Sequence, residues 1–507
     1  MTTEANRISV IRHDILEHVA RAFLEKGSDF GPELDKIPFL MRPKGSQYNR
    51  CCLYKDRAII RFRCVAALGF RIEDEEDDSI PLAEYAQKAL QRTGPSAPIL
   101  TVCDIACQGC VPARFFVTDV CQGCVARPCE SACRFGAITR VRGKSYIDPE
   151  KCRNCGKCHD ACPYQAIVRL KVPCEEACPV RAIRKGENGH ASIDPDKCTS
   201  CGRCMRACPF GTVIERSEII DVLAALKSGR HMTALVAPAI VGQFPAELGK
   251  VIEGLRRLGF SSVLEVASGA DITSRNEADE FVERMEKGEK FMTTSCCPAF
   301  VTAVRRHMPE VLPFVSSTGT PMHYAARLAR ESTPDTMTVF IGPCVAKRFE
   351  ALEDEYVSYV LTFEELAGII EAKDVDTSLL EVDEAEALHA ASAAGRGFAQ
   401  SGGVAKAVAD KIKEWHPDMD VKIASAQGLA ECKKLLMLAK AGKYNGYLLE
   451  GMGCPGGCIG GAGTIADPAR TAIQLNKYVK EAPFADPEQS PFMSEIHVLK
   501  DDPDFEI

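Results

Sequence analysis

The spacing of the cysteines is the feature that most constrains how this chain can fold. Of the 26 cysteines in 507 residues, 17 lie between Cys103 and Cys208. Two runs have the spacing C-x2-C-x2-C-x3-C-P, one beginning at Cys152 and the other at Cys198. In a reducing compartment, such a density of thiols indicates metal ligation rather than disulfide formation. We therefore expect this region to bind metal.

The spacing favours iron-sulfur clusters over zinc. In two-cluster ferredoxins, the first three cysteines of such a run bind one [4Fe-4S] cluster and the fourth binds its neighbour. A looser run, C-x2-C-x4-C-x3-C, begins at Cys121 and resembles the first half of such a pair. Zinc also accepts four thiolates, but its motifs rarely have the third closely spaced cysteine and the trailing proline. We predict ferredoxin-like domains that carry single electrons.

If the fourth cysteine of each run binds the cluster of the neighbouring run, these cysteines divide into groups of four. The groups predict three to four [4Fe-4S] clusters. The fourth group is expected because CQGCVPAR at Cys107 nearly repeats CQGCVAR at Cys121 and supplies the C-x2-C that Cys174 and Cys208 lack. Cys103 is an alternative member of that group. The predicted groups are Cys121, Cys124, Cys129 and Cys162; Cys152, Cys155, Cys158 and Cys133; Cys198, Cys201, Cys204 and Cys178; and Cys107, Cys110, Cys174 and Cys208.

Composition and charge exclude several classes of protein. The apolar fraction of 46% and the net charge of −8 exclude a largely disordered chain. No apolar run reaches the 18 or more residues of a membrane-spanning helix, and the first residues lack a signal peptide, so we expect a cytoplasmic protein with no membrane contact. Residues 101–216 include 18 basic and 12 acidic residues. These basic residues interleave with the cysteine motifs, so we expect them to offset anionic clusters and predict no nucleic-acid partner.

The rest of the chain predicts two further units. Apolar residues between Ile8 and Leu24 follow a helical period that stops at Gly27, the apolar run 57–68 suggests a strand, and the acidic run 73–78 suggests a charged loop. Beyond about Ile219, buried strands at 233–240, 262–266, 337–341 and 446–450 alternate with helices such as 245–258, which is typical of an α/β domain. The predicted divisions are 1–100, a small α+β unit of unknown role; 101–217, the α+β ferredoxin-like electron-transfer region; and 218–507, the α/β catalytic domain.

Three cysteine motifs lie in the predicted α/β domain. TTSCCPAF contains Cys296 and Cys297, IGPCVAKRFE contains Cys344, and EGMGCPGGCIGGAG contains Cys454 and Cys458. Each follows a predicted strand, so each loop could lie at the carboxyl edge of a sheet, where open α/β folds bind ligands. Spacing alone does not establish that these loops converge, and structural or redox-active thiols are the alternative.

These motifs, in this order over roughly residues 230–480, resemble the signature motifs of the [FeFe]-hydrogenases. The resemblance implies that Cys297, Cys344, Cys454 and Cys458 bind a [4Fe-4S] cluster. It implies that Cys458 bridges to a diiron unit with CO, cyanide and azadithiolate ligands, which completes the H-cluster. The implied fold is an α/β catalytic domain with converging cysteine loops, and the implied substrates are H2 and protons.

The resemblance implies roles for residues around this cofactor. Cys296 matches the thiol that exchanges protons with the amine bridge, and Lys347 matches the lysine that binds a cyanide ligand. The implied proton relay consists of Glu277, Glu280, Ser316 and Arg284, and the residues packed around the diiron unit are Pro238, Phe398 and Met452.

The sequence departs from the best-known family members in the cofactor pocket and is similar to the branch called group B. Gly342 replaces Met, Ala239 replaces Ser, Met322 replaces Gln, and Ala299-Phe300 replaces Gly-Trp. The expected function is a cytoplasmic hydrogenase that exchanges electrons with ferredoxin or a similar carrier and needs maturation proteins. The alternatives are a non-catalytic iron-sulfur scaffold, against which Cys296 and Lys347 argue, and an H2 sensor, for which no PAS-like or kinase segment is evident. We expect the remaining cysteines to be buried free thiols: Cys51, Cys52, Cys64 and Cys432.

Overall fold

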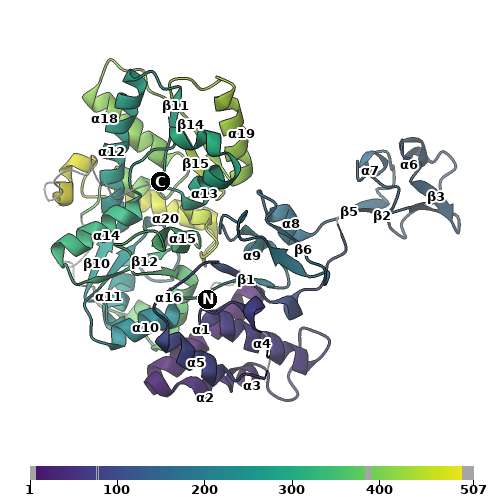
Figure 1. Cartoon of the computed structure of the whole chain (residues 1–507), viewed down its shortest axis with the longest axis horizontal. Coiled ribbons are helices and arrows are strands. Elements are labelled where there is room, and N and C mark those ends of the chain that lie inside the picture. Colours follow the sequence, from purple (N-terminus) through teal and green to yellow (C-terminus); the bar gives the residue numbers. More distant parts are fainter. Residues whose placement is uncertain (1–6, 76, 78, 113, 383–389, 494–507) are drawn as a thin grey trace.

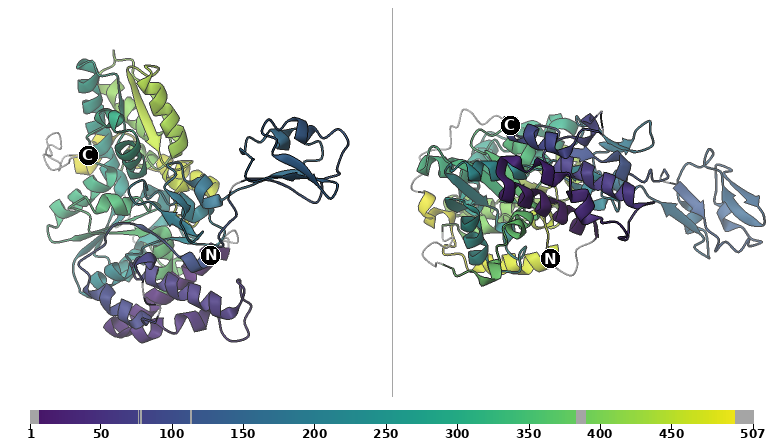
Figure 2. Two further views of the ribbon diagram at one scale, coloured as in Figure 1. Left: turned by 45° about the vertical axis from the view of Figure 1, so that its right-hand side comes forward. Right: turned by 90° about the horizontal axis from the view of Figure 1, so that it is seen from below.

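The computed structural model describes residues 7–75, 77, 79–112, 114–382 and 390–493. Figure 1 shows helices from the first hundred residues below the α/β domain, and a small cysteine-rich unit that projects to one side. Figure 2 shows the same projection in two further orientations. No helix among the described residues is long and apolar enough to cross a bilayer.

The N-terminal region is helical. The predicted helix is confirmed and ends at Lys26, followed by Gly27 with φ of +60°, a conformation that favours glycine. The predicted strand at 57–68 is wrong, and with it the α+β character of this unit among its described residues before Leu100. Ile59, Ile60 and Cys64 are buried on one face of a helix, because an apolar run fits a buried helix as well as a strand. The helices are α1 (Arg7–Lys26), α2 (Gly31–Leu34), α3 (Ile37–Met41), α4 (Leu53–Ala67) and α5 (Leu82–Gln91).

The predicted acidic loop at 73–78 lies partly outside the described residues. Its first two residues belong to a 3-10 turn, Ile72–Asp74. The Glu73 carboxylate accepts a hydrogen bond from the backbone N–H of Val102 at 2.8 Å. This part of the acidic run therefore anchors the first strand rather than standing free in solvent.

The cysteine-rich region consists of two units, each built from short antiparallel strand pairs and helices of four or five residues. In the projecting unit, β2 pairs with β5 and β3 pairs with β4. In the unit against the α/β domain, β1 pairs with β8 and β6 pairs with β7. The elements are β1 (Leu100–Val102), β2 (Arg114–Val117), α6 (Pro128–Ser131), β3 (Ile138–Val141), β4 (Lys144–Ile147), α7 (Lys157–Asp160), β5 (Ile167–Leu170), α8 (Pro173–Ala177), β6 (Ile183–Lys185), β7 (Ala191–Ile193), α9 (Arg203–Ala207) and β8 (Val213–Glu215).

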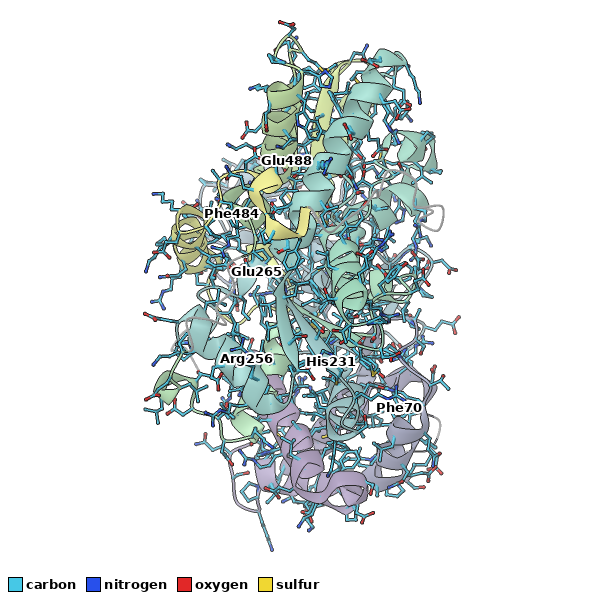
Figure 3. All side chains as sticks on the ribbon, turned by 90° about the vertical axis from the view of Figure 1, so that its left-hand side faces the viewer. Phe70, His231, Arg256, Glu265, Phe484 and Glu488 are labelled. Atoms are coloured by element: carbon cyan, nitrogen blue, oxygen red, sulfur yellow. The ribbon has the colours of Figure 1, made fainter. Side chains whose placement is uncertain are left out.

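The α/β domain has two parallel sheets, with strand orders β10-β9-β12-β13 and β11-β15-β14. The four predicted strands are confirmed as β9, β10, β12 and β15, except that β9 ends at Val236 and the rest of the strand predicted at 233–240 contains a 3-10 turn, Pro238–Ile240. Figure 3 labels His231 just before β9 and Glu265 at the end of β10, which mark opposite ends of the first sheet. The strands are β9 (Met232–Val236), β10 (Ser262–Glu265), β11 (Phe291–Thr293), β12 (Met337–Gly342), β13 (Tyr359–Thr362), β14 (Lys422–Gln427) and β15 (Tyr447–Met452).

Helices cover both sheets and contribute side chains to the regions between them. The predicted helix at 245–258 is confirmed as α11, which begins three residues later. The helices are α10 (Ile219–Lys227), α11 (Leu248–Leu258), α12 (Val266–Glu286), α13 (Pro298–His307), α14 (Pro321–Ser332), α15 (Lys347–Ala351), α16 (Phe363–Ala372), α17 (Ala393–Gly397), α18 (Gly403–Trp415), α19 (Leu429–Lys440) and α20 (Pro468–Lys480).

The N-terminal helices share a core with the α/β domain. One cluster of buried apolar residues runs from α1 to the first sheet and includes Leu16, Leu235 and Ile341. Helix α1 packs on α16, where Gly368 permits close approach because a Cβ atom there would lie 3.1 Å from Leu16 Cβ. Arg12 of α1 also binds the Glu364 carboxylate through two nitrogens, at 3.1 and 2.7 Å.

A buried ion-pair cluster joins the cysteine-rich region to the α/β domain. Arg348 of α15 is 1% exposed. Its Nη1 atom lies 3.0 Å from the Glu215 carboxylate at the end of β8, and it also contacts the carboxylates of Glu218 and Glu365. Because a buried guanidinium needs such partners, this cluster orients β8 relative to α15.

The contact at Gly368 predicts that a larger residue will separate α1 from α16. Gly368→Val should lower the melting temperature of the full chain by several degrees, consistent with a cost of about 1–3 kcal/mol for overpacking. Ala367→Val, on the same helix but only half-buried, is the matched control. Equal melting temperatures for the two variants would contradict the tight packing described here.

Candidate active site and metal centres

The cysteine loops of the α/β domain meet at one cavity. The loop after β11 provides Cys296 and Cys297, the loop after β12 provides Cys344, and the loop after β15 provides Cys454 and Cys458. Strand β12 belongs to one sheet and strands β11 and β15 to the other, so the cavity lies where the carboxyl ends of both sheets face each other. The other predicted residues that line it are Lys347, Pro238, Phe398 and Met452.

Four of these thiols have the environment of metal ligands. Burial raises the pKa of Cys297, and it raises the pKa of Cys458 to about 12. Neighbouring thiols raise the pKa of Cys344 and Cys454 beyond the effect of burial. A thiolate in such a place needs a positive partner, which a metal centre supplies. The four residues therefore fit a thiolate-bound cluster.

Lys347 is a buried cation beside these thiols. It is 8% exposed, and its Nζ atom donates to both oxygens of Glu350 at 2.8 Å and to Thr320 Oγ1 at 3.3 Å. Burial lowers the pKa of Lys347, but the Glu350 carboxylate more than offsets this, so the net shift is upward. Lys347 therefore stays charged at the cavity wall. The sequence analysis missed Glu350, although it ends the IGPCVAKRFE motif.

Aromatic rings pack closely against two glycines near the cavity, and one of these glycines, Gly342, is a sequence departure. A Cβ atom at Gly342 would lie 2.3 Å from the ring of Phe340, which lines the cavity. A Cβ atom at Gly451 would lie 2.3 Å from the ring of Phe300. Each ring thus occupies the space that a side chain would need, and Gly342 leaves room for Phe340. Ala239 and Met322 also line the cavity.

Helix α12 carries a buried carboxyl group to the cavity. Glu277 is fully buried, and its Oε1 atom accepts hydrogen bonds from the Ser295 backbone N–H at 2.9 Å and from Ser295 Oγ at 3.2 Å. Burial raises the pKa of Glu277 to about 8. The pKa of the neighbouring Cys296 thiol is raised by burial first and by the charge of Glu277 second. Both groups are therefore mainly protonated near neutral pH.

The second carboxyl group of α12 lies one turn further out. Glu280 accepts hydrogen bonds from Ser316 Oγ at 2.5 Å and Thr318 Oγ1 at 2.9 Å, and Arg284 lies 2.7 Å away. Burial opposes ionisation of Glu280, but hydrogen bonds from Ser316 and Ser317 and the charge of Arg284 lower its pKa overall. The predicted relay residues thus comprise the buried, mainly protonated Glu277, followed further out by Glu280 with its partners Ser316 and Arg284.

Ser295 and Thr318 connect the two carboxyl groups, and sequence analysis missed both. Ser295 Oγ donates to the Thr318 carbonyl at 2.7 Å, and the Thr318 backbone N–H donates to Ser316 Oγ at 3.1 Å. Ser295 directly precedes Cys296 in the TTSCCPAF motif, which was the available signal. Thr318 has no such signal because its contacts are tertiary.

Comparisons with known proteins agree with this geometry. Residues 230–462 match the family model for the iron only hydrogenase large subunit, C-terminal domain. The chain is 31% identical over 382 residues to the periplasmic [Fe] hydrogenase large subunit of Nitratidesulfovibrio vulgaris, a match that covers 64% of this chain and 86% of that one. The chain belongs to the [FeFe]-hydrogenase family.

More distant relatives of this family member differ in their stated roles. Iron hydrogenase 1 of Clostridium pasteurianum is 28% identical over 302 residues, which cover 49% of this chain and about half (53%) of that protein. A probable cytosolic Fe-S cluster assembly factor of Culex quinquefasciatus is 22% identical over 304 residues, covering 48% and 63% of the two chains. The relatives of this chain therefore include both hydrogenases and a probable assembly factor.

The cysteine-rich region also matches iron-sulfur families, and the predicted groups come together. Residues 145–168 match a 4Fe-4S binding domain and residues 173–212 a 4Fe-4S dicluster domain. Three separate cavities are each lined by one complete predicted group: Cys121, Cys124, Cys129 and Cys162; Cys133, Cys152, Cys155 and Cys158; and Cys107, Cys110, Cys174 and Cys208. Cys103 lies in a different apolar cluster and lines none of these three cavities.

The remaining group lies between those cavities and the candidate active site. The charges of Cys201, Cys198 and Cys178 all raise the pKa of Cys204 beyond the effect of its burial, so the four thiols are neighbours. Cys201 likewise raises the pKa of Cys454 in the catalytic loop. This third group therefore adjoins the active-site cavity.

The cysteines without predicted ligand roles divide into two kinds. Cys64 and Cys432 are buried, as expected of free structural thiols. The expectation fails for Cys51, which is exposed, and for Cys52, which is half-buried beside it with the two sulfurs 3.9 Å apart. They precede α4, where the chain passes over the surface.

The raised pKa of Glu277 predicts a pH-dependent stability. The folded protein holds this proton more tightly than the unfolded chain, whose glutamates titrate near 4.5, so stability should fall as pH rises towards about 8. Between pH 6 and pH 8 the free energy of unfolding of the native protein should fall by about 1–3 kcal/mol, and Glu277→Gln should abolish this fall, as measured by denaturant unfolding. Glu283→Gln, at an exposed site on the same helix, should leave the pH profile unchanged. An unchanged profile for Glu277→Gln would contradict the assignment.

The contact between Gly342 and Phe340 predicts coupled substitutions. Gly342→Met alone should lower the melting temperature because its side chain overlaps the Phe340 ring, and Phe340→Ala alone should lower it by leaving a cavity. The double variant should be more stable than the sum of the two losses predicts, by about 1 kcal/mol or more. Additive losses would show that the ring does not occupy the space of residue 342.

Proposed function

We propose that this protein is a hydrogenase that interconverts H2 with two protons and two electrons. The observation that carries the proposal is the convergence of five cysteines and Lys347 on one largely apolar cavity, with two carboxyl groups behind Cys296. The group of thiols that contains Cys201, which is suited to an accessory cluster, lies next to Cys454 of the cavity. Such a site combines routes for protons and electrons, which this reaction needs.

In this proposal Cys297, Cys344, Cys454 and Cys458 would hold a [4Fe-4S] cluster, and the Cys458 thiolate would also hold a diiron unit with CO, cyanide and azadithiolate ligands. This H-cluster, when bound, supplies the open metal position at which H2 forms or is split. Pro238, Phe398 and Met452 exclude water from around it. The Lys347 ammonium is held by Glu350 and would bind a cyanide ligand, which would position the diiron unit.

Protons would reach the cavity through residues of α12 and the loops beside it. Cys296 holds a proton at its sulfur because its thiol is buried, and it exchanges that proton with Glu277. Hydrogen bonds of Ser295, Thr318 and Ser316 fix Glu277 and Glu280 in one framework. The proton itself would pass from Glu277 through the Ser316 hydroxyl to Glu280, which accepts the hydrogen bond of that hydroxyl. Arg284 is 15% exposed at its side chain and holds Glu280 at the surface end. Glu277 is mainly protonated and Glu280 is ionised, so a proton on Glu277 has an acceptor further out. The pH changes this arrangement by changing the protonation of Glu277.

Electrons would travel through three or four accessory [4Fe-4S] clusters between the active site and the projecting unit. The projecting unit, between Arg114 and Lys171, has 11 basic and 5 acidic residues. A positive surface of this kind favours encounter with an acidic one-electron carrier such as ferredoxin. The same proposal places the protein in the cytoplasm and requires maturation proteins that insert the diiron unit.

A non-catalytic scaffold is the second candidate, because one of the relatives is named as an Fe-S cluster assembly factor. A scaffold needs thiols for clusters but has no use for a protonated thiol beside a buried carboxyl relay. Cys296, Lys347 and Glu277 therefore favour the catalytic function.

Replacement of the proposed proton carrier separates these functions. Cys296→Ala in the matured protein should reduce H2 turnover at least about 100-fold, the usual range for loss of an acid-base group, while iron content and cluster absorption stay unchanged. Cys432→Ala removes another buried thiol that does not line the cavity and should retain turnover. Full turnover by Cys296→Ala would exclude the proposed route, and no turnover by the matured native protein would exclude the function.

A further inference from the structure

A second large cavity lies where the N-terminal helices, the second cysteine-rich unit and the last loop of the α/β domain meet. It has a volume of about 560 Å³ and no lining residue in common with the candidate active site. Six arginines line it but only one acidic residue, Asp56, among the described lining residues. The arginines are Arg7, Arg12, Arg42, Arg50, Arg63 and Arg206.

The described carboxylates balance only part of the positive charge of this cavity, and a thiolate-bound cluster on Cys208 would offset a further part. Arg12 is paired with Glu364, and Arg42 Nε lies 3.5 Å from Asp56 Oδ2. Three of the other arginines donate to neutral oxygens. Arg50 donates to Ala106 O and Gln108 Oε1, Arg63 to Phe210 O and Gly211 O, and Arg206 to Gly461 O and Thr464 Oγ1.

Arg63 is the most informative member of this set. It is 5% exposed, and its buried Nε atom has no hydrogen-bond partner among the described residues. Burial lowers the pKa of Arg63 to about 10. The Cys103 and Cys208 sulfurs oppose this shift, whereas the nearby charges of Arg12 and Arg50 act in the same direction as burial. Burying a guanidinium beside two others is costly unless an anion accompanies them.

We propose that this cavity is a binding site for a small molecule with a diphosphate group. Guanidinium groups match phosphate oxygens with paired hydrogen bonds, and several of them around one cavity can bind a group with more than one negative charge. Apolar side chains of Ile8, Ile59, Met205 and Phe210 share the lining. They would contact an organic part of the ligand, such as a nucleoside, so pyrophosphate and a nucleoside diphosphate are the two sources of this chemistry.

The position of the cavity gives the ligand a route to influence electron transfer. Cys208 and Pro209 line both this cavity and the cavity of the fourth cysteine group. An anion held there would lower the reduction potential of a cluster on Cys208, because added negative charge disfavours the reduced state. This consequence rests on the proposed function, whereas binding itself does not.

The test is calorimetric titration of the full-length, cluster-loaded protein with pyrophosphate and, separately, with ADP. Binding should weaken at least about tenfold in Arg50→Gln and in Arg63→Gln, as expected when a charge-assisted hydrogen bond is lost. Arg50 is half-buried, so its variant tests the site even if Arg63→Gln fails to fold. Lys55→Gln removes the same charge from an exposed site on α4 outside the cavity and should leave binding unchanged.

The outcomes distinguish the two ligand sources and the failure of the proposal. Tighter binding of ADP than of pyrophosphate would identify a nucleotide, and equal binding would identify the diphosphate group alone as the recognised part. Absence of binding for both probes at millimolar concentration, or equal weakening by Lys55→Gln and the arginine variants, would overturn the proposal. Binding by the native protein, together with absence of H2 turnover after maturation, would support this site while refuting the proposed function.

Discussion

Four thiols at the carboxyl ends of two parallel sheets can ionise only beside a positive centre, because burial opposes each thiolate. Strands β11, β12 and β15 are each followed by a loop whose cysteines line one cavity, so a single metal centre there can serve all four thiolates. The buried Lys347 and the apolar residues around it then create a site in which water is scarce. The position of the two sheets therefore determines the candidate active site.

The same constraint explains the surrounding polar structure. A site closed to water needs internal routes, and α12 supplies one through Glu277 and Glu280, which lie three residues apart on one face. On the other side, Arg348 holds the cysteine-rich region against α15, the helix that begins with Lys347. On the proposed function, the proton and electron routes would therefore enter the cavity from different directions. This separation follows from the fold rather than from any single residue.

Local features were predictable from the sequence and tertiary features were not. The cysteine groups come together as predicted because spacing within each run and exchange between runs limit the possible pairings. The helix around Ile60 was mistaken for a strand because an apolar run has no distinguishing period. Thr318 and the arginine cavity were missed because their partners come from segments distant in the sequence, such as Arg12 and Arg206. Phe340 explains Gly342 only once the space that its ring fills is known.

The central claim is that the cysteine cavity holds a catalytic diiron cofactor. Infrared spectroscopy of the anaerobically purified, matured protein, in the region where metal-bound CO and cyanide absorb, tests this most directly when H2 turnover is assayed on the same sample. We expect CO and cyanide bands that shift under H2, together with turnover. Iron-sulfur clusters without those bands, after maturation has been verified on a known hydrogenase, would contradict it and leave a protein that only binds clusters.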